Sequence, residues 1–253
     1  MAPKIAILYY SMYGHIKTLA EAEAAGVKEA GGSPDLYQIA ETLPDDVLAK
    51  MHAPAKDSSV PVLSDPSVLE QYDGVLLGIP TRYGNFPAQW KAFWDHTGKQ
   101  WQTGAFWGKY AGVFISTGTL GGGQESTAIA AMSTLTHHGF IYVPLGYKTV
   151  FGLLGDLSEV RGGSPWGAGT FSGADGSRQP SAKELEVAKE QGKAFYGAKQ
   201  QQQVGSSTAG ATKSAPPAGA DQGQKQQTLT TPQSREENED KGPCGLPFKC
   251  TVA

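Results

Sequence analysis

The sequence predicts an α/β fold in which helices cover both faces of a five-stranded parallel sheet. Apolar runs of strand length alternate along the chain with segments of helical periodicity, as in successive βαβ units. The run Gly74–Ile79 (GVLLGI) is apolar at consecutive positions, which is typical of a strand buried on both faces. Loops rich in glycine and hydroxyl side chains follow three of the strands, as expected at the ligand-binding edge of a doubly wound sheet.

Each element follows from its own pattern. Apolar residues recur at helical spacing after the first strand, and this pattern stops at a pair of glycines. Ser181 and Glu184 have the spacing of a capping box, which marks the start of the last helix. The expected strands are Lys4–Tyr10, Pro34–Ile39, Gly74–Ile79, Tyr110–Ser116 and Phe140–Pro144, and the expected helices are His15–Ala30, Phe86–His96, Gln124–His138 and a final one ending near Lys199. The connections Pro44–Pro66 and Gly146–Pro180 leave room for short helices or an extra hairpin.

The chain changes character near residue 200. Residues 1–199 contain the aromatic and branched aliphatic side chains of a folded domain, whereas residues 200–243 are mainly Gln, Gly, Ser, Thr, Ala, Pro and charged residues. So little apolar surface does not offset the entropy lost on ordering. The sequence therefore predicts one folded domain over 1–199, a disordered linker over 200–243 and a short tail over 244–253.

Composition argues against several classes of protein. The net charge of −3 and the pI near 6.0 argue against a nucleic-acid partner, because phosphate binding requires a concentrated basic surface. No apolar run is long enough to span a bilayer, and the first residues lack the features of a secretory signal, so we expect a cytosolic origin. Both cysteines, Cys244 and Cys250, lie in the last ten residues, and no H-x-x-H spacing occurs, so we expect neither a core disulfide nor a metal site.

The three loops after the strands are Ser11–Ile16, Pro80–Phe86 and Ser116–Glu125. The first leads into a helix N-terminus, where free backbone amides and the helix dipole favour an anion. Ser11 adds a hydroxyl group, and Gly14 allows the backbone to close on a ligand. An ordinary strand–helix turn with a serine N-cap explains this loop equally well when it is considered alone.

Together the loops favour a mononucleotide that carries a flat ring. The G-x-G-x-x-G fingerprint is absent after the first strand, and Gly104–Lys109 has one residue too few between its glycines for a Walker loop. One phosphate with an attached ring fits better, and the second and third loops would flank that ring. Arg82 would place a cation near the ring edge where a reduced flavin develops negative charge.

These motifs resemble the WrbA-type NAD(P)H:quinone oxidoreductases, a family of flavodoxin-like FMN proteins. The resemblance covers roughly residues 3–198, and its motifs are YYSMYGHI, PTRYGN, STGT followed by GGGQE, HHG at 137–139, and VRGGSPWGA with DGSRQPS between 160 and 181. It implies a flavodoxin-like sheet with the strand order 2-1-3-4-5. It also implies FMN as the cofactor and a homotetramer in which the active sites are shared between subunits.

The resemblance further implies roles for individual residues. Tyr13 would lie near the nicotinamide nucleotide, Trp101 would border the substrate, and His137 would approach the flavin as the catalytic residue. Leu120 departs from the bacterial pattern as an extra residue before the glycine run. The implied FMN contacts are Ser11, Met12, Tyr13, Gly14, His15, Ile16, Thr81, Arg82, Tyr83, Gly84, Asn85, Ser116, Thr117, Gly118, Thr119, Gly121, Gly122 and His137.

The implied reaction is the two-electron reduction of a quinone to its hydroquinone by NADH or NADPH, with both substrates using one face of FMN in turn. Two alternatives stay open at this point. One is an FMN protein whose main role is interaction or organisation at a membrane, and the other is a flavodoxin-type one-electron carrier. The sequence does not distinguish NADH from NADPH or identify the quinone.

Ordinary packing accounts for several other conspicuous side chains. Trp90, Phe93 and Trp94 have helical spacing, which predicts core or subunit-interface positions. His138 ends a helix, where the dipole favours a cation. His52 is expected at the surface.

The last four residues, Cys250 to Ala253, fit the C-a-a-X pattern and predict farnesylation of Cys250. Cys244 is a candidate for palmitoylation, which would supply the second lipid that stable anchoring needs. Lys241 and Lys249 lie nearby. We therefore expect attachment to the cytoplasmic face of a membrane, such as the plasma membrane, beside a cytosolic pool; an unmodified tail is the alternative.

Overall fold

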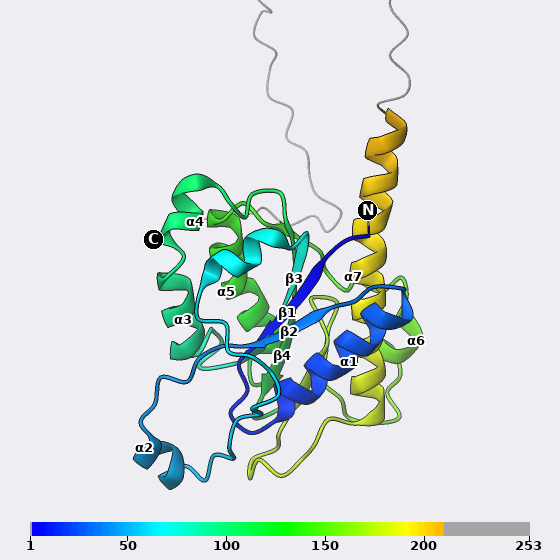
Figure 1. Cartoon of the computed structure of the whole chain (residues 1–253). Helices are drawn as coiled ribbons and strands as arrows, with labels where there is room; N and C mark the ends of the chain where they lie inside the picture. Colours follow the sequence, from blue (N-terminus) through cyan, green and yellow to red (C-terminus); the bar gives the residue numbers. More distant parts are fainter. Residues whose placement is uncertain (1, 210–253) are drawn as a thin grey trace, which may run out of the picture. The chain divides into compact units, whose positions relative to one another are not determined.

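Parallel strands in the order β2-β1-β3-β4-β5 form the sheet of the computed structural model, which describes residues 2–209 (Figure 1). This arrangement confirms the expected strand order 2-1-3-4-5. Each of the four adjacent pairs is parallel. The strands are β1 (Ile5–Tyr9), β2 (Asp35–Gln38), β3 (Gly74–Pro80), β4 (Tyr110–Thr117) and β5 (Ile141–Tyr142).

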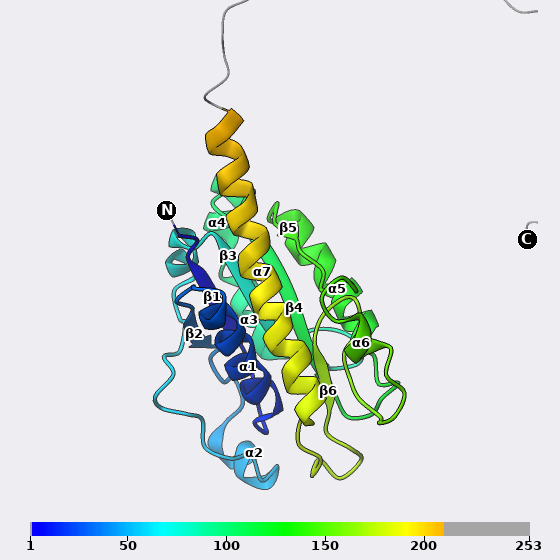
Figure 2. The same ribbon diagram turned by 90° about the vertical axis from the view of Figure 1, so that its right-hand side faces the viewer.

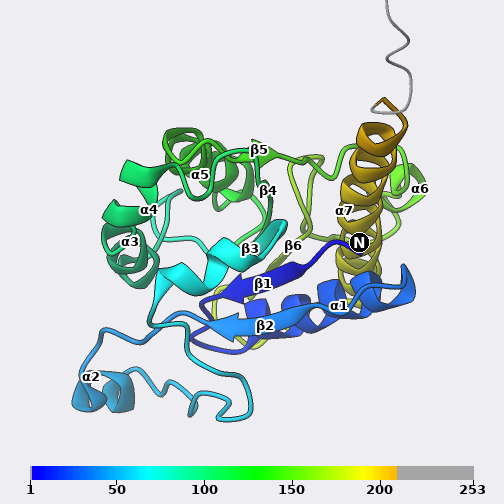
Figure 3. The ribbon, with the colours of Figure 1, turned by 45° about the horizontal axis from the view of Figure 1, so that its top comes forward.

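Helices cover both faces of the sheet (Figures 2 and 3). Side chains alternate along β1: Ile5, Ile7 and Tyr9 belong to one buried cluster, and Ala6 and Leu8 belong to the other. The first cluster includes apolar residues of α1 (His15–Glu29) and α7 (Ala182–Ala209). The second includes residues of α3 (Ala88–Asp95) and α5 (Gln124–His137), and α4 (Gly98–Thr103) lies on the same side of the sheet.

The edge of the sheet beside β4 is made by two short segments rather than one strand. β5 pairs with Tyr110 and Ala111 at the start of β4, and β6 (Gly169–Phe171) pairs with residues 115–117 at its end. β5 is shorter than the expected strand Phe140–Pro144. Pro144 has no N–H group with which to continue the ladder of hydrogen bonds. The long connections contain α2 (Asp45–Lys50), the 3-10 helix η1 (Pro66–Gln71) and α6 (Phe151–Leu154) as well as β6.

Helix α7 begins with the predicted capping box. The Ser181 amide donates to Glu184 Oε2 at 2.8 Å, and the Glu184 amide donates to Ser181 Oγ at 3.3 Å. The helix continues to Ala209, beyond the expected end near Lys199, so the linker boundary expected at residue 200 falls inside it. Four consecutive glutamines at 200–203 favour this extension, because glutamine is a good helix former.

The remainder of the expected linker, residues 210–243, and the tail with Cys244 and Cys250 lie outside the described residues. Within residues 2–209, no helix is both long and apolar enough to cross a membrane.

Helices α1 and α7 pack with their backbones in direct contact. A Cβ at Gly26 would lie 1.9 Å from the carbonyl oxygen of Lys189, and one at Gly192 would lie 2.2 Å from that of Glu23. The Glu23 side chain is fully buried here, and neither of its carboxyl oxygens has a hydrogen-bond partner among the described residues. Burial raises the pKa of Glu23 well above its ordinary value, so the native protein holds a neutral acid at this position.

Replacing Glu23 by methionine should stabilise the protein, and more so at high pH. Between the ordinary carboxyl pKa and the raised native pKa, the unfolded chain releases a proton that the folded chain retains. Stability of the natural protein therefore falls as pH rises through that window, and methionine removes the loss. We expect a gain of about 1–3 kcal/mol in the free energy of unfolding at pH 8 and a smaller gain at pH 5.

Urea unfolding at the two pH values measures this difference. Glu21→Met, at an exposed position of the same helix, is the matched control and should change stability by no more than about 0.5 kcal/mol at either pH. An equal gain at both pH values for Glu23→Met would show that Glu23 does not titrate as described.

Candidate functional site

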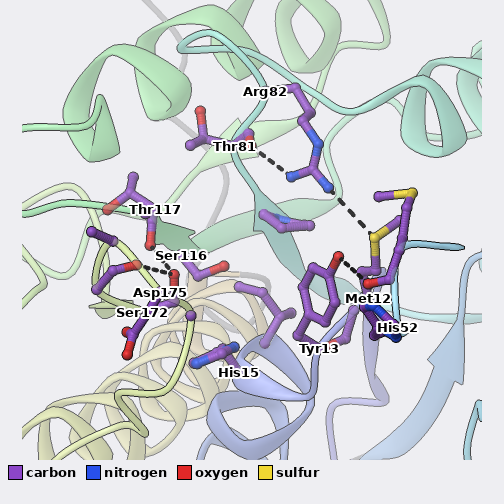
Figure 4. A pocket seen from close by; sticks show the side chains of 18 residues that line it. Met12, Tyr13, His15, His52, Thr81, Arg82, Ser116, Thr117, Ser172 and Asp175 are labelled. Atoms are coloured by element: carbon purple, nitrogen blue, oxygen red, sulfur yellow. Dashed lines mark hydrogen bonds between the residues drawn. The ribbon is translucent and has the colours of Figure 1, made fainter. Parts of the chain in front are cut away.

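The carboxyl ends of β1, β3, β4 and β6 border a cavity of about 650 Å³ (Figure 4). This volume is in the range of small-molecule and cofactor sites. The three predicted loops all contribute to the wall, through Ser11, Met12, Tyr13, His15 and Ile16, through Pro80, Thr81 and Arg82, and through Ser116, Thr117 and Gly118. Two further segments that the sequence did not identify complete it, Ser172–Gly176 after β6, and Met51 with His52 after α2.

The first wall is a helix N-terminus with a fixed backbone. Gly14 is the N-cap of α1 with φ of 94°, a left-handed conformation that glycine adopts without strain. Its amide donates to Ser11 Oγ at 3.1 Å, so Ser11 shapes the turn without being the N-cap itself. The first amides of α1 have no carbonyl partner within the helix, and together with the dipole they favour an anion.

A partly buried network of hydrogen bonds behind this loop holds it in place. Lys56 Nζ donates to the Ser11 carbonyl at 2.8 Å and pairs with Glu41 at 3.1 Å. Burial alone would raise the pKa of Glu41, but hydrogen bonds from Tyr10, the Leu43 amide, Gln89 and Lys56 lower it to about 2. Glu41 is therefore a carboxylate at neutral pH, and it fixes the lysine that positions the loop.

The second loop is a tight turn that presents Arg82. The amide of Arg82 donates to the Asn85 carbonyl at 2.9 Å and the amide of Asn85 donates back to the Arg82 carbonyl at 3.1 Å. Tyr83 and Gly84 between them have φ of 54° and 73°, as in the primed turns that glycine favours. The Arg82 guanidinium donates to the Thr81 carbonyl at 2.9 Å at the cavity wall (Figure 4). Tyr83, Gly84 and Asn85 shape this turn but do not line the cavity.

The third loop contributes only its first residues to the cavity. Thr117 Oγ1 donates to the Thr119 carbonyl at 2.7 Å, which turns the chain away from the sheet edge. Leu120, the extra residue of this loop, is 54 % exposed. The predicted contacts Thr119, Gly121 and Gly122 therefore lie beyond the cavity lining.

The fourth wall, Ser172–Gly176, is anchored by an ion pair whose carboxylate is buried and whose arginine is partly exposed. Arg178 Nη1 and Nη2 each donate to one carboxylate oxygen of Glu184 at 3.0 Å, and Glu184 is fully buried. The carbonyl of Arg178 is also 2.7 Å from His15 Nε2, which joins this wall to the start of α1. The DGSRQPS motif at 175–181 was a signal for this segment, but β6 is too short to be recognised from periodicity.

Comparison with known proteins agrees with this geometry. A family model described as NADPH-dependent FMN reductase matches residues 3–150 of the chain. The chain belongs to the NADPH-dependent FMN reductase family. It is 75 % identical over 196 residues to the minor allergen Alt a 7 of Alternaria alternata, an alignment that covers 78 % of this chain and 96 % of the allergen. It is 58 % identical over 196 residues to the NAD(P)H quinone oxidoreductase PST3 of Candida albicans, covering 78 % of this chain and 98 % of that protein.

The fold is also similar to solved structures. A flavodoxin, WrbA-like protein from Agrobacterium tumefaciens superimposes with a TM-score of 0.51 at 23 % identity, covering 79 % of this chain and 98 % of the other. The fold of this FMN reductase family member is therefore flavodoxin-like.

The cavity of this FMN reductase family member has donors suited to FMN. The α1 amides and Ser11 suit the phosphate, because a phosphate accepts hydrogen bonds from backbone N–H groups at a helix N-terminus. The hydroxyl group of Ser116 and the cation of Arg82 suit the polar edge of an isoalloxazine ring. The hydroxyl groups of Thr81 and Thr117 also line the cavity, but they donate within the protein, to Thr127 Oγ1 and to the Thr119 carbonyl.

A single chain does not bring His137 and Trp101 to this cavity. Helix α5 begins beside the cavity at Gln124 and runs back antiparallel to β4 for 14 residues, about 21 Å, so His137 lies toward the opposite edge of the sheet. Trp101 belongs to α4, a helix that lies near that same opposite edge (Figure 1). Its side chain is 59 % exposed. The roles expected for both residues therefore require a neighbouring copy of the chain. Tyr13, by contrast, lines the cavity, and its hydroxyl donates to the Met51 carbonyl at 3.1 Å.

The structure corrects the interpretation of His138 and adds a feature to that of His52. His138 is buried between the rings of Trp94 and Phe106 and shares a hydrogen bond of 2.9 Å with Thr97 Oγ1. Burial, and then the nearby His137, lower the pKa of His138, so it is a neutral core residue rather than a cation at a helix end. His52 is exposed as expected, but it also lines the cavity. The predicted packing of Trp90, Phe93 and Trp94 in the core is confirmed.

Proposed function

We propose that this chain is a WrbA-type, FMN-dependent NAD(P)H:quinone oxidoreductase. The observation that carries the proposal is the cavity at the carboxyl edge of the sheet, which combines a helix N-terminus with polar loops in a member of the FMN reductase family. Relatives that are 55–58 % identical and named NAD(P)H quinone oxidoreductases support the choice of substrates. FMN bound in this cavity supplies hydride transfer from a nicotinamide and two-electron reduction of a quinone.

In this proposal, different residues of the chain bind different parts of FMN and of the nicotinamide nucleotide. The α1 amides and Ser11 hold the phosphate, and the loop residues Ser116 and Gly118 border the polar edge of the ring. Arg82 stabilises negative charge near that edge. Tyr13, at the mouth of the cavity, orients the nicotinamide nucleotide.

An absorbance spectrum followed by a quinone assay tests the proposal. The purified full chain should be yellow, or become so when FMN is supplied, and should oxidise NADH or NADPH in the presence of benzoquinone. A colourless protein that takes up no FMN contradicts the proposal. Bound FMN without turnover would favour the interaction role. Accumulation of one-electron-reduced flavin during a reductive titration would favour the electron carrier.

We further propose that the enzyme is a homotetramer and that His137 and Trp101 of one copy border the cavity of another. The position of both residues far from their own cavity, with Trp101 exposed, motivates this arrangement. Light scattering measures the oligomeric state. His137→Ala should lower quinone reduction with little change in FMN affinity, and unchanged turnover would remove His137 from the reaction.

The C-terminal cysteines suggest a membrane tether. We propose farnesylation of Cys250 and palmitoylation of Cys244, which together would hold the enzyme at the cytoplasmic face of a membrane, such as the plasma membrane. Incorporation of a labelled prenyl group that is lost in Cys250→Ser would support this tether. An intact Thr251–Ala253 terminus by mass spectrometry would contradict it.

A further inference from the structure

His15 is held in one orientation at the start of α1. Its ring lines the cavity, its side chain is almost completely buried, and Nε2 lies 2.7 Å from the carbonyl oxygen of Arg178. A carbonyl oxygen only accepts hydrogen bonds, so Nε2 must carry the proton of this interaction. The hydrogen bond therefore fixes both the rotation of the ring and the tautomer of its neutral form.

The other ring nitrogen faces the ligand space. Within residues 2–209, Nδ1 makes no hydrogen bond, and it is not among the polar atoms that are sealed from solvent without a partner. Because the ring borders the cavity and Nε2 is directed at the Arg178 carbonyl, we infer that Nδ1 is open to the cavity. In the neutral ring with a proton on Nε2, Nδ1 carries a lone pair and acts only as an acceptor.

A phosphate monoester at the same helix N-terminus is also an acceptor. Its second ionisation has a pKa of about 6, so above neutral pH its three terminal oxygens carry no proton. A dianion placed against the lone pair of Nδ1 would bring two acceptors together and leave a buried polar group without a partner. One added proton between them converts this repulsion into a charge-assisted hydrogen bond.

We propose that His15 couples FMN binding to the uptake of one proton, which is shared between Nδ1 and the phosphate. The inference rests on the proposed function for the identity of the ligand. Whether the proton resides on the imidazole or on the phosphate, the balance is the same: neutral protein plus FMN dianion plus one proton gives the complex. FMN binding therefore weakens as pH rises above neutrality.

Other charged groups around the cavity do not replace His15 in this role. The Arg178 side chain is occupied by the buried Glu184, and Lys56 is occupied by Glu41 and the Ser11 carbonyl. The other titratable or charged groups at the cavity wall are Tyr13, Arg82, Asp175 and His52. On α1 itself, Lys17 pairs with Glu21 and Asp57. Among these, His52 is the other imidazole, so it is the residue to compare with His15.

Calorimetric titration of the flavin-stripped full chain with FMN tests the proposal. At pH 8, titrations in buffers of different ionisation enthalpy should show uptake of roughly 0.5–1 proton per FMN, and the Kd should rise by up to about tenfold per pH unit above neutrality. Riboflavin, which has the ring without the phosphate, should bind without proton uptake. Proton uptake with riboflavin would place the proton elsewhere and overturn the proposal.

His15→Gln is the informative variant, because a glutamine amide can donate to the Arg178 carbonyl but takes up no proton. It should bind FMN more weakly at pH 7, with a Kd that is flat between pH 7 and 9, where free FMN is a dianion throughout. His52→Asn is the matched comparison, since asparagine tolerates the φ of 53° at this position, and it should retain proton uptake. Uptake that persists in His15→Gln or disappears in His52→Asn overturns the proposal.

If His15→Gln does not fold, the pH dependence of FMN binding to the natural protein still tests the proton coupling. FMN binding that is independent of pH and of buffer would contradict the proton coupling while leaving the proposed function intact. Failure to bind FMN under any condition would contradict both.

Discussion

Replacing Gly192 by alanine should lower the free energy of unfolding by about 2–4 kcal/mol. The added Cβ would lie 2.2 Å from the carbonyl oxygen of Glu23 and 3.0 Å from its carbonyl carbon. Both atoms belong to the backbone of α1, so no side-chain rotation relieves the contact. The two helices must move apart, which opens the cluster that α1 and α7 form on this face of the sheet.

Gly197→Ala is the matched control on the same helix. No atom lies within 4 Å of a Cβ at this position, and alanine is the better helix former by about 0.5–1 kcal/mol. The two glycine-to-alanine changes should therefore have opposite signs in the same urea unfolding experiment.

A second readout connects this contact to the site. Residues at the N-terminus of α1 line the cavity in which we propose that FMN binds, so a displaced helix should also weaken FMN binding. If Gly192→Ala is as stable as the natural protein, the helices are not in contact as described.

The sequence was sufficient to predict most of the sheet and three walls of the cavity. β3 is continuously apolar, and each parallel strand must end at the same edge, so the loops after the strands were expected to converge. The strand order was implied by resemblance, because periodicity does not determine which strands are neighbours. The position of His137 was also predictable in principle, since a helix that follows a parallel strand runs back toward the opposite edge.

The fourth wall required the structure. β6 has only three residues, which is too short for a periodic signal, and His15 is bonded to a residue 163 positions away along the chain. The sequence identified Glu184 as the acidic member of a capping box. It gave no sign that Glu184 also accepts hydrogen bonds from the Gly162 amide, Thr170 and Arg178, because those partners meet only in the folded chain.

Replacing Glu184 by alanine should be the most damaging single change near the site. The carboxylate is fully buried and accepts hydrogen bonds from the Ser181 amide as well as from Gly162, Thr170 and Arg178. Removing this carboxylate leaves several buried donors without an acceptor and deprives the partly exposed Arg178 of its ion-pair partner. We expect a loss of about 3–5 kcal/mol in the free energy of unfolding, measured by urea unfolding.

Glu186→Ala provides the matched control. This residue lies two positions further along α7 and is exposed, so its replacement should change stability by no more than about 0.5 kcal/mol. The expected contrast between the two variants isolates burial and pairing from the general effect of removing an acidic residue from the first turns of a helix.

The same variant should weaken FMN binding beyond its effect on global stability. Without Glu184, Arg178 keeps its hydrogen bonds to the Ser172 and Phe171 carbonyls but loses both bonds to the carboxylate. The wall Ser172–Gly176 and the carbonyl that orients His15 are then held less firmly. Fluorescence titration with FMN at a temperature where Glu184→Ala remains folded by circular dichroism measures this effect separately. A folded Glu184→Ala protein with unchanged FMN affinity would show that the Arg178–Glu184 pair supports the fold but does not position the fourth wall of the cavity.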